Sequence, residues 1–331
     1  MNYYFKKGFR LLYLIIFIFI IASCQNKENH SLKLWMCETD FNGDCVLYNY
    51  DDKFILCDTG YNNISFNSLK EALNKYNSNH IDYFIASHFH NDHIDNLDDI
   101  IKEKYIDKKT IIYLPPKPDF SITNERVTYA YNHVIESLNE NNIDYIIPKE
   151  LDELTINDFK LTFFNCEHQE YYDLMKNNEL VNDYNICSLC FKINYGNSSI
   201  ISTGDSGGIL WEKYLNYIDK CTIYKAHHHS VDSSYNEILK DEFGIKFFNK
   251  IMPDVVITSL GKYIAEADIN NDYYNRFVNN KFGLQEWCEK NNVPNYVVGY
   301  KDNKNIEIEI TKESYKLISN SIPCIRWYIA I

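Results

Sequence analysis

The stretch His88-Phe89-His90-Asn91-Asp92-His93 places three imidazoles and a carboxylate within six residues. It follows residues 81–87, an apolar run whose length and β-branched content predict a buried strand. Side chains on a loop that leaves a strand end can converge on one point from several directions. Because imidazole and carboxylate together bind zinc, manganese or iron, the stretch indicates a metal site rather than a histidine-rich surface turn.

Three further segments carry matching side chains at the ends of apolar runs. Asp58 ends the run at residues 53–57, and it can hold a neighbouring loop by accepting hydrogen bonds or merely cap a turn. Asp205 ends the run at residues 198–203, where it can bridge two metal ions or cap the helix expected from residue 211. His227, His228 and His229 follow a third run, so six of the ten histidines fall in two clusters.

In this order the residues resemble the metallo-β-lactamase fold superfamily. Within it, the chain is most similar to the hydrolase domain of the ComEC/Rec2 competence group. Three segments carry this resemblance: Phe41-Asn42-Gly43-Asp44 resembles the group's Gly-Gln-Gly-Asp, Asn185-Ile186-Cys187-Ser188 its Asn-x-x-Ser, and Tyr224-Lys225-Ala226-His227-His228-His229 its Leu-Lys-x-x-His-His. The resemblance covers residues 34–311. Together with strand-like runs that alternate with helical patterns, it implies an α/β fold, a four-layer αββα sandwich.

The resemblance also implies a ligand set for one or two divalent ions, zinc or alternatively manganese. His88 and His90 would bind a first metal; Asp92, His93 and one histidine of 227–229 would bind a second; Asp205 would bridge them. Asp92 would also orient the attacking hydroxide, whereas Asp58 and Asp44 would support the ligands from behind. Counting from Lys225 selects His228 as the last ligand, and aligning Ser230 with the group's serine selects His227; we prefer His228.

The chain departs from the group's pattern at several positions. Asp95-Asn96 replaces an expected Gly-Gly, and Ser230-Val231 replaces Gly-Ser. Asn185 stands, as in the competence group, where classical β-lactamases have a separate ligand, and we interpret His168, the other candidate, as a surface histidine. Cys187 and Cys190 are expected three residues apart on one strand, on opposite faces, which favours buried free thiols over a disulfide.

The first residues have the pattern of an export signal. Lys6, Lys7 and Arg10 precede the apolar run 11–22, which is shorter than the roughly 20 residues that span a bilayer. Ile21-Ala22-Ser23-Cys24 resembles a bacterial lipobox, and an uncleaved signal anchor is the alternative. We therefore predict a lipoprotein signal peptide at 1–23, lipidation of Cys24, a tether at 24–33, a hydrolase domain at 34–331, and an extracytoplasmic, membrane-anchored location in a bacterium.

Charge limits the substrates. The formal net charge is −13, and removing residues 1–23, which hold three basic and no acidic residues, makes it −16. Such a surface repels long nucleic acid, while bound metal would still attract a small or short phosphodiester. We predict a metal-dependent hydrolase of phosphodiesters, with Lys225, His229 or Ser230 available to stabilise the leaving group. The alternatives are hydrolysis of lactone, amide or thioester bonds, and a non-enzymatic metal-holding surface lipoprotein.

Overall fold

The structure is a computed structural model that describes residues 30–40, 42–178, 184–206, 213–230, 242–261 and 284–324. The chain from Leu32 onward forms one compact unit. Cys24, the predicted signal peptide, Phe41, Val231 and the helix start predicted at residue 211 lie outside the described residues. Within the described part, no helix combines the length and apolar character needed to cross a bilayer.

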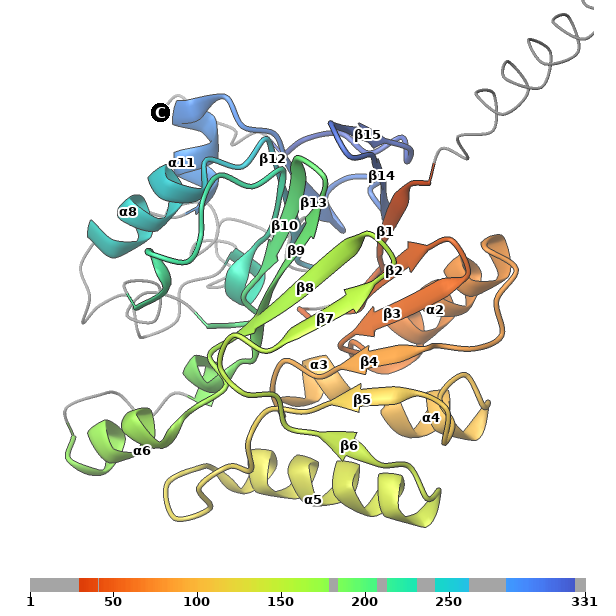
Figure 1. Ribbon diagram of the computed structural model, residues 1–331, viewed down its shortest axis with the longest axis vertical. Coiled ribbons are helices and arrows are strands. Elements are labelled where there is room, and N and C mark those ends of the chain that lie inside the picture. The colour runs from red at the N-terminus through yellow and green to blue at the C-terminus, as the bar shows by residue number, and fades with distance from the viewer. Residues whose placement is uncertain are drawn as a thin grey trace, which may run out of the picture. The chain divides into compact units, whose positions relative to one another are not determined.

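Two mixed β-sheets form the centre of the molecule (Figure 1). The eight-stranded sheet has the order β15 (Tyr315–Leu317), β14 (Ile306–Ile310), β1 (Leu32–Met36), β2 (Val46–Tyr50), β3 (Lys53–Cys57), β4 (Tyr83–Ile85), β5 (Ile111–Tyr113) and β6 (Tyr145–Ile146). The seven-stranded sheet has the order β13 (Asn295–Val298), β12 (Val255–Ser259), β11 (Ile223–Lys225), β10 (Ser198–Ser202), β9 (Cys190–Tyr195), β8 (Phe159–Phe164) and β7 (Glu153–Ile156).

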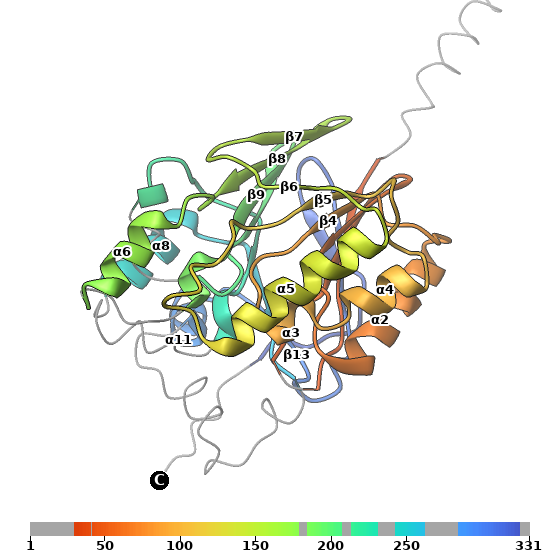
Figure 2. The same cartoon turned by 90° about the horizontal axis from the view of Figure 1, so that it is seen from below.

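Helices cover the outer face of each sheet, as Figures 1 and 2 show from two directions. The eight-stranded sheet is covered by α2 (Asn62–Lys75), α3 (Asn91–Ile94), α4 (Leu97–Lys102) and α5 (Glu125–Glu140). The helices α6 (Gln169–Lys176), α8 (Glu242–Ile251) and α11 (Leu284–Asn291) lie outside the other sheet, and the short 3₁₀ helices η1 (Tyr184–Cys187) and η2 (His227–Ser230) complete the described set. The predicted four-layer sandwich is confirmed.

The alternation of side chains along the strands builds two hydrophobic layers. On β3, Ile55 packs in the cluster shared by the two sheets, while Phe54 and Leu56 pack in the cluster shared with the helices. Aromatic rings meet across the sheets: those of Tyr50 and Phe159 have centroids 5.4 Å apart. Because both faces of the central strands are covered, their sequences are almost continuously apolar rather than alternating.

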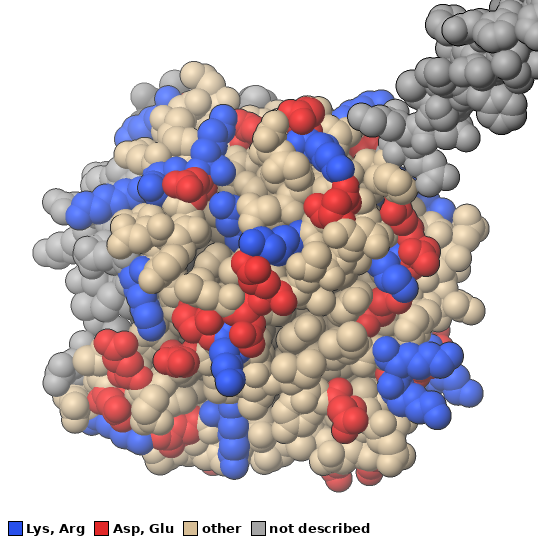
Figure 3. Space-filling model, viewed as in Figure 1, with Lys and Arg blue, Asp and Glu red and all other residues tan. Residues whose placement is uncertain are grey.

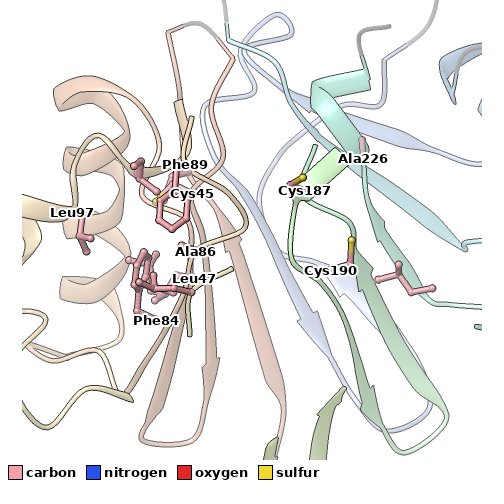
Figure 4. Packing of buried hydrophobic residues seen from close by; sticks show 14 of the residues in the cluster. Cys45, Leu47, Phe84, Ala86, Phe89, Leu97, Cys187, Cys190 and Ala226 are labelled. Atoms are coloured by element: carbon pink, nitrogen blue, oxygen red, sulfur yellow. The ribbon is translucent and has the colours of Figure 1, made fainter. Parts of the chain in front are cut away.

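The segment around Cys187 differs from the prediction. Residues 184–187 form η1 rather than part of a strand, and β9 begins only at Cys190. The two cysteines therefore belong to different elements, as the close view in Figure 4 shows. The nine described cysteines are all buried, and none of these nine forms a disulfide. Asn165 stabilises the turn here by donating from its side-chain amide to the carbonyls of Ile186 and Ser188.

The strand directions bring the predicted site residues to one edge of the sandwich. β3 and β4 run parallel in one sheet, and β10 and β11 run parallel in the other. Asp58 follows β3, the 88–93 stretch follows β4, Asp205 follows β10 and the three histidines follow β11. Ligand sites in α/β folds form beyond the carboxyl ends of such strands.

Candidate metal centre

The loop after β4 holds its imidazoles close together. His88 and His93 are fully buried, whereas His90 and Asp92 are partly exposed. His88 Nε2 lies 2.9 Å from His90 Nδ1, and the His88 and His93 rings have centroids 4.2 Å apart. The peptide turns into α3 directly after His90, so that Asp92 and His93 occupy the first turn of this helix.

Four residues from both sheets converge on one point. Ligand atoms of Asp92, His93, Asp205 and His229 all lie within 4.8 Å of one another. Asp205 Oδ2 is 3.1 Å from His93 Nε2, 3.6 Å from His229 Nε2 and 3.8 Å from His88 Nε2. Asp205 Oδ1, His93 Nε2 and His229 Nε2 are buried without a hydrogen-bond partner. Because buried polar atoms are rarely left unpaired, this donor set fits a divalent ion.

Burial and neighbouring charges shift the pKa values of the side chains in this cluster. Burial opposes the charged form of His93, but the carboxylates of Asp205, Asp58 and Asp92 outweigh it and raise its pKa well above 6.5. Burial likewise disfavours ionised Asp205, yet His93 and His229 hold its pKa well below the usual value. Burial lowers the pKa of His88 and of His229, which favours the neutral imidazole that binds metal.

Asp58 supports the loop from behind. Its carboxylate accepts hydrogen bonds from the Ser87 backbone N (2.6 Å), from Ser87 Oγ (2.7 Å) and from His93 Nδ1 (2.9 Å). This leaves His93 Nε2 directed at Asp205. Ser87 was missed by the sequence analysis; it also lies 3.0 Å from His88 Nδ1. Its position directly before the first histidine was the one available hint.

The three consecutive histidines point to different surroundings. The ring of His227 stacks on Phe248 and its Nδ1 lies 2.9 Å from the Tyr224 hydroxyl. His228 Nε2 lies 3.3 Å from Asn185 Nδ2 and 3.9 Å from Asp205 Oδ2. His229 is the one in the four-residue cluster, with Nε2 3.4 Å from Asp92 Oδ2. Our preference for His228 beside Asp92 and His93 therefore differs from the structure, which puts His229 there.

A comparison of the sequence with known protein families agrees with this geometry. Residues 39–244, more than half of the chain, match the family described as the metallo-beta-lactamase superfamily. The chain belongs to this superfamily. No curated protein matched the sequence.

Two solved structures show the same fold at low sequence identity. The metallo-beta-lactamase fold protein YhfI from Bacillus subtilis is 13% identical with a TM-score of 0.52, over 85% of this chain and 99% of that one. CmlA, a diiron β-hydroxylase from Streptomyces venezuelae, is 12% identical with a TM-score of 0.52, over 86% of this chain and 55% of that one. These likenesses establish the fold.

This member of the metallo-beta-lactamase superfamily buries a lysine beneath its metal centre. Lys225 is 1% exposed; its ammonium forms an ion pair with Asp44, which is equally buried, and lies 3.4 Å from the Gly204 carbonyl. Burial lowers the pKa of Lys225 to about 7. Lys225 therefore cannot reach a leaving group. This differs from the sequence analysis, which offered Lys225 as a residue that stabilises the leaving group.

The structure of this superfamily member also differs from the sequence-based predictions for Ser230 and His168. Ser230 is buried with its Oγ 3.2 Å from Thr258 Oγ1, so it faces the sheet rather than the site mouth. His168, which we interpreted as a surface histidine, is 2% exposed; its Nε2 lies 2.9 Å from the Asn165 carbonyl at the start of α6. Two groups of candidate metal ligands lie among the described residues, Asp92, His93, Asp205 and His229, and behind them Asp44, Asp58 and His93; His168 belongs to neither.

Proposed function

We propose that this protein is a membrane-tethered, metal-dependent hydrolase that uses a metal-activated water, most readily on a phosphodiester. The observation that carries the proposal is the convergence of Asp92, His93, Asp205 and His229 within 4.8 Å, with unpartnered ligand atoms directed at one another. A purely structural cluster would be expected to pair these atoms, because leaving them buried and unpaired destabilises the fold.

The geometry supports two metal positions that share Asp205. His229 joins Asp92 and His93 at one position. His88 and His90 turn ring nitrogens 2.9 Å apart toward the other position, and the His228 Nε2 atom, 3.9 Å from Asp205 Oδ2, completes that group. The turn at 227–230 thus replaces, with His228, the separate histidine that Asn185 displaces. Zinc is the first choice and manganese the second, because the donors are imidazole and carboxylate.

Bound metal ions would activate a water molecule and neutralise charge that develops during hydrolysis. The residues around them supply position. Asp92 is the least buried carboxylate of the cluster, at 30% side-chain exposure, so it lies where an attacking water enters and can orient it. The side chain of His228 is 20% exposed at the same cluster, so it lies where a substrate can contact it.

Charge and resemblance support the choice of substrate. Acidic and basic side chains are mixed on the face shown in Figure 3, and the net charge of −13 disfavours long nucleic acid. A small or short phosphodiester needs only the local positive charge of the metal centre. The resemblance of Gly43-Asp44 and Asn185-Ile186-Cys187-Ser188 to the ComEC/Rec2 group supports the same class. Tethering through a lipid on Cys24 rests on the lipobox-like sequence at 21–24.

The first experiment measures bound metal per chain by atomic emission in the full-length protein, beside a His88→Ala/His90→Ala double variant. We expect one to two equivalents in the parent and a large loss in the variant. A parent that cannot be loaded with zinc or manganese would contradict the proposal.

The second experiment offers the metal-loaded protein bis(p-nitrophenyl) phosphate, a lactone and a thioester. Faster turnover of the lactone or thioester would replace the phosphodiester assignment, and no turnover would favour a metal-holding lipoprotein.

A further inference from the structure

The buried ion pair between Asp44 and Lys225 joins the two sheets directly behind the metal centre. Asp44 precedes β2 of one sheet, and Lys225 ends β11 of the other. Both residues are 1% exposed, so neither contacts solvent or a substrate. Burying two charges is unfavourable unless good geometry and further hydrogen bonds compensate, and such pairs can serve specificity rather than stability. Because this pair lies behind the metal centre, we consider its effect on the orientation of the metal ligands.

The two carboxylate oxygens of Asp44 have different surroundings. Oδ2 accepts from the Lys225 ammonium. Oδ1 has no hydrogen-bond partner and lies 3.6 Å from His229 Nδ1, which is also buried and unpartnered. An acceptor and a ring nitrogen therefore face each other a few tenths of an ångström beyond hydrogen-bond distance. On the opposite side of the same ring, His229 Nε2 faces Asp92 and Asp205.

The backbone around Asp44 is held firmly against the metal loop. The Asp44 N–H donates to the Asp92 carbonyl at 3.1 Å. A Cβ on Gly43 would lie 2.9 Å from the same carbonyl, so only glycine allows this close approach. The Ser259 hydroxyl donates to the Gly43 carbonyl from β12. Because the backbone is fixed on both sides, the carboxylate direction depends on Lys225.

We propose that Lys225 and Asp44 are positioning residues: Lys225 holds Oδ2 so that Oδ1 accepts a hydrogen bond from His229 Nδ1–H and presents Nε2 to the metal. The inference rests on the proposed function, since it concerns the same site. It assigns neither residue a contact with substrate. A charged acceptor behind a ligand histidine fixes its tautomer and ring orientation, and losing one typically weakens metal binding about 10–100-fold.

The test compares Asp44→Asn, Lys225→Met and the double variant in the full-length chain, using Co²⁺ as the metal. Each single variant leaves a buried charge without its partner, so we expect a lower melting temperature of the metal-free protein. The double variant removes both charges and should largely recover that melting temperature. It should not recover metal binding: we expect Co²⁺ affinity to stay about 10–100-fold below the parent, with altered visible absorption of the bound ion.

A matched control is available at the other end of β3. Lys53 and Asp82 form a lysine–aspartate pair of 2.9 Å remote from the cluster, and Lys53→Met/Asp82→Asn should leave Co²⁺ affinity and spectrum unchanged. If the Asp44→Asn/Lys225→Met variant bound Co²⁺ as tightly as the parent, the ion pair would only stabilise the fold, and the inference would be overturned. A parent chain that binds no Co²⁺, Zn²⁺ or Mn²⁺ overturns the proposed function as well, so the two failures are distinguishable.

Discussion

His228 and His229 are neighbours in sequence but serve different sides of Asp205 because of their backbone conformation. Both lie in the left-handed region, with φ of 41° and 54°, and Ser230 follows at 59°. Non-glycine residues in this region each cost about 1–2 kcal/mol, and such strain is concentrated at functional sites. The turn directs His229 toward Asp92 and His228 toward Asn185, so two adjacent histidines can bind two different ions.

This division of roles predicts separate losses of metal. We expect His228→Ala and His229→Ala each to lose about one equivalent of zinc by atomic emission, and the double variant to lose both. Both rings lie near Asp205, but His228 faces Asn185 and His229 faces Asp92. His227→Ala is the control, since its ring packs on Phe248. If His228→Ala retained both equivalents of zinc, the metal position formed with His88 and His90 would not need His228.

The raised pKa of His93 predicts a pH dependence. In the metal-free protein at neutral pH, His93 stays protonated between Asp58 and Asp205. Metal binding at Nε2 displaces that proton, so zinc affinity should rise with pH up to the raised pKa. Calorimetry in buffers of different ionisation enthalpy measures the proton release. An affinity that is flat between pH 6 and pH 9 would contradict a charged His93.

The same shift has a consequence for the stability of the metal-free protein. A group whose pKa is higher when folded adds stability that is fully present below its unfolded value of about 6.5 and is lost as the pH rises through the folded value. We therefore expect the urea midpoint of metal-free protein to fall as the pH is raised above neutrality. His93→Gln should reduce this slope, and an unchanged slope would assign it to other groups.

At the scale of elements, the loop after β10 depends on Gly204. Its φ is +53°, and a Cβ there would lie 2.8 Å from Ser188 Cβ and 2.9 Å from Ser87 Cβ. Gly204→Ala should therefore destabilise the fold by more than the about 1–2 kcal/mol of left-handed backbone alone, and should displace Asp205. Urea unfolding measures the difference from Asn77→Ala, an exposed residue at φ 54°. Equal costs would mean that the loop absorbs the clash.

The sequence predicted the elements that carry the site better than it predicted individual side chains. The ends of β3, β4, β10 and β11 follow from apolar runs that stop at Asp58, His88, Asp205 and His227, because burial on both faces makes these runs continuous. The choice between His228 and His229 depends on φ values that composition does not encode. The burial of His168 and the 3₁₀ turn at 184–187 depend on long-range packing, for example on the hydrogen bonds of Asn165.

At the scale of the whole molecule, the metal centre joins the two sheets. His88, His90, Asp92 and His93 follow a strand of the eight-stranded sheet, whereas Asp205 and His229 follow strands of the seven-stranded sheet. Bound metal should therefore resist separation of the sheets. We expect chelation to lower the melting temperature, since a ligand at 1,000 times its Kd stabilises by about 4 kcal/mol. His88→Ala/His90→Ala should respond less to chelator; an equal response would place the stabilising metal elsewhere.

The pairing of β1 with β14 joins the beginning of the domain to its end: Leu32 lies opposite Ile310. On the ribosome, β1 can pair with β2 early, but its other edge must wait for residues 306–310. At about 5–20 residues per second, that delay is on the order of tens of seconds. An open strand edge is a template for wrong partners during that time. We therefore expect the nascent chain to need a chaperone that covers this edge until residues 306–310 have emerged.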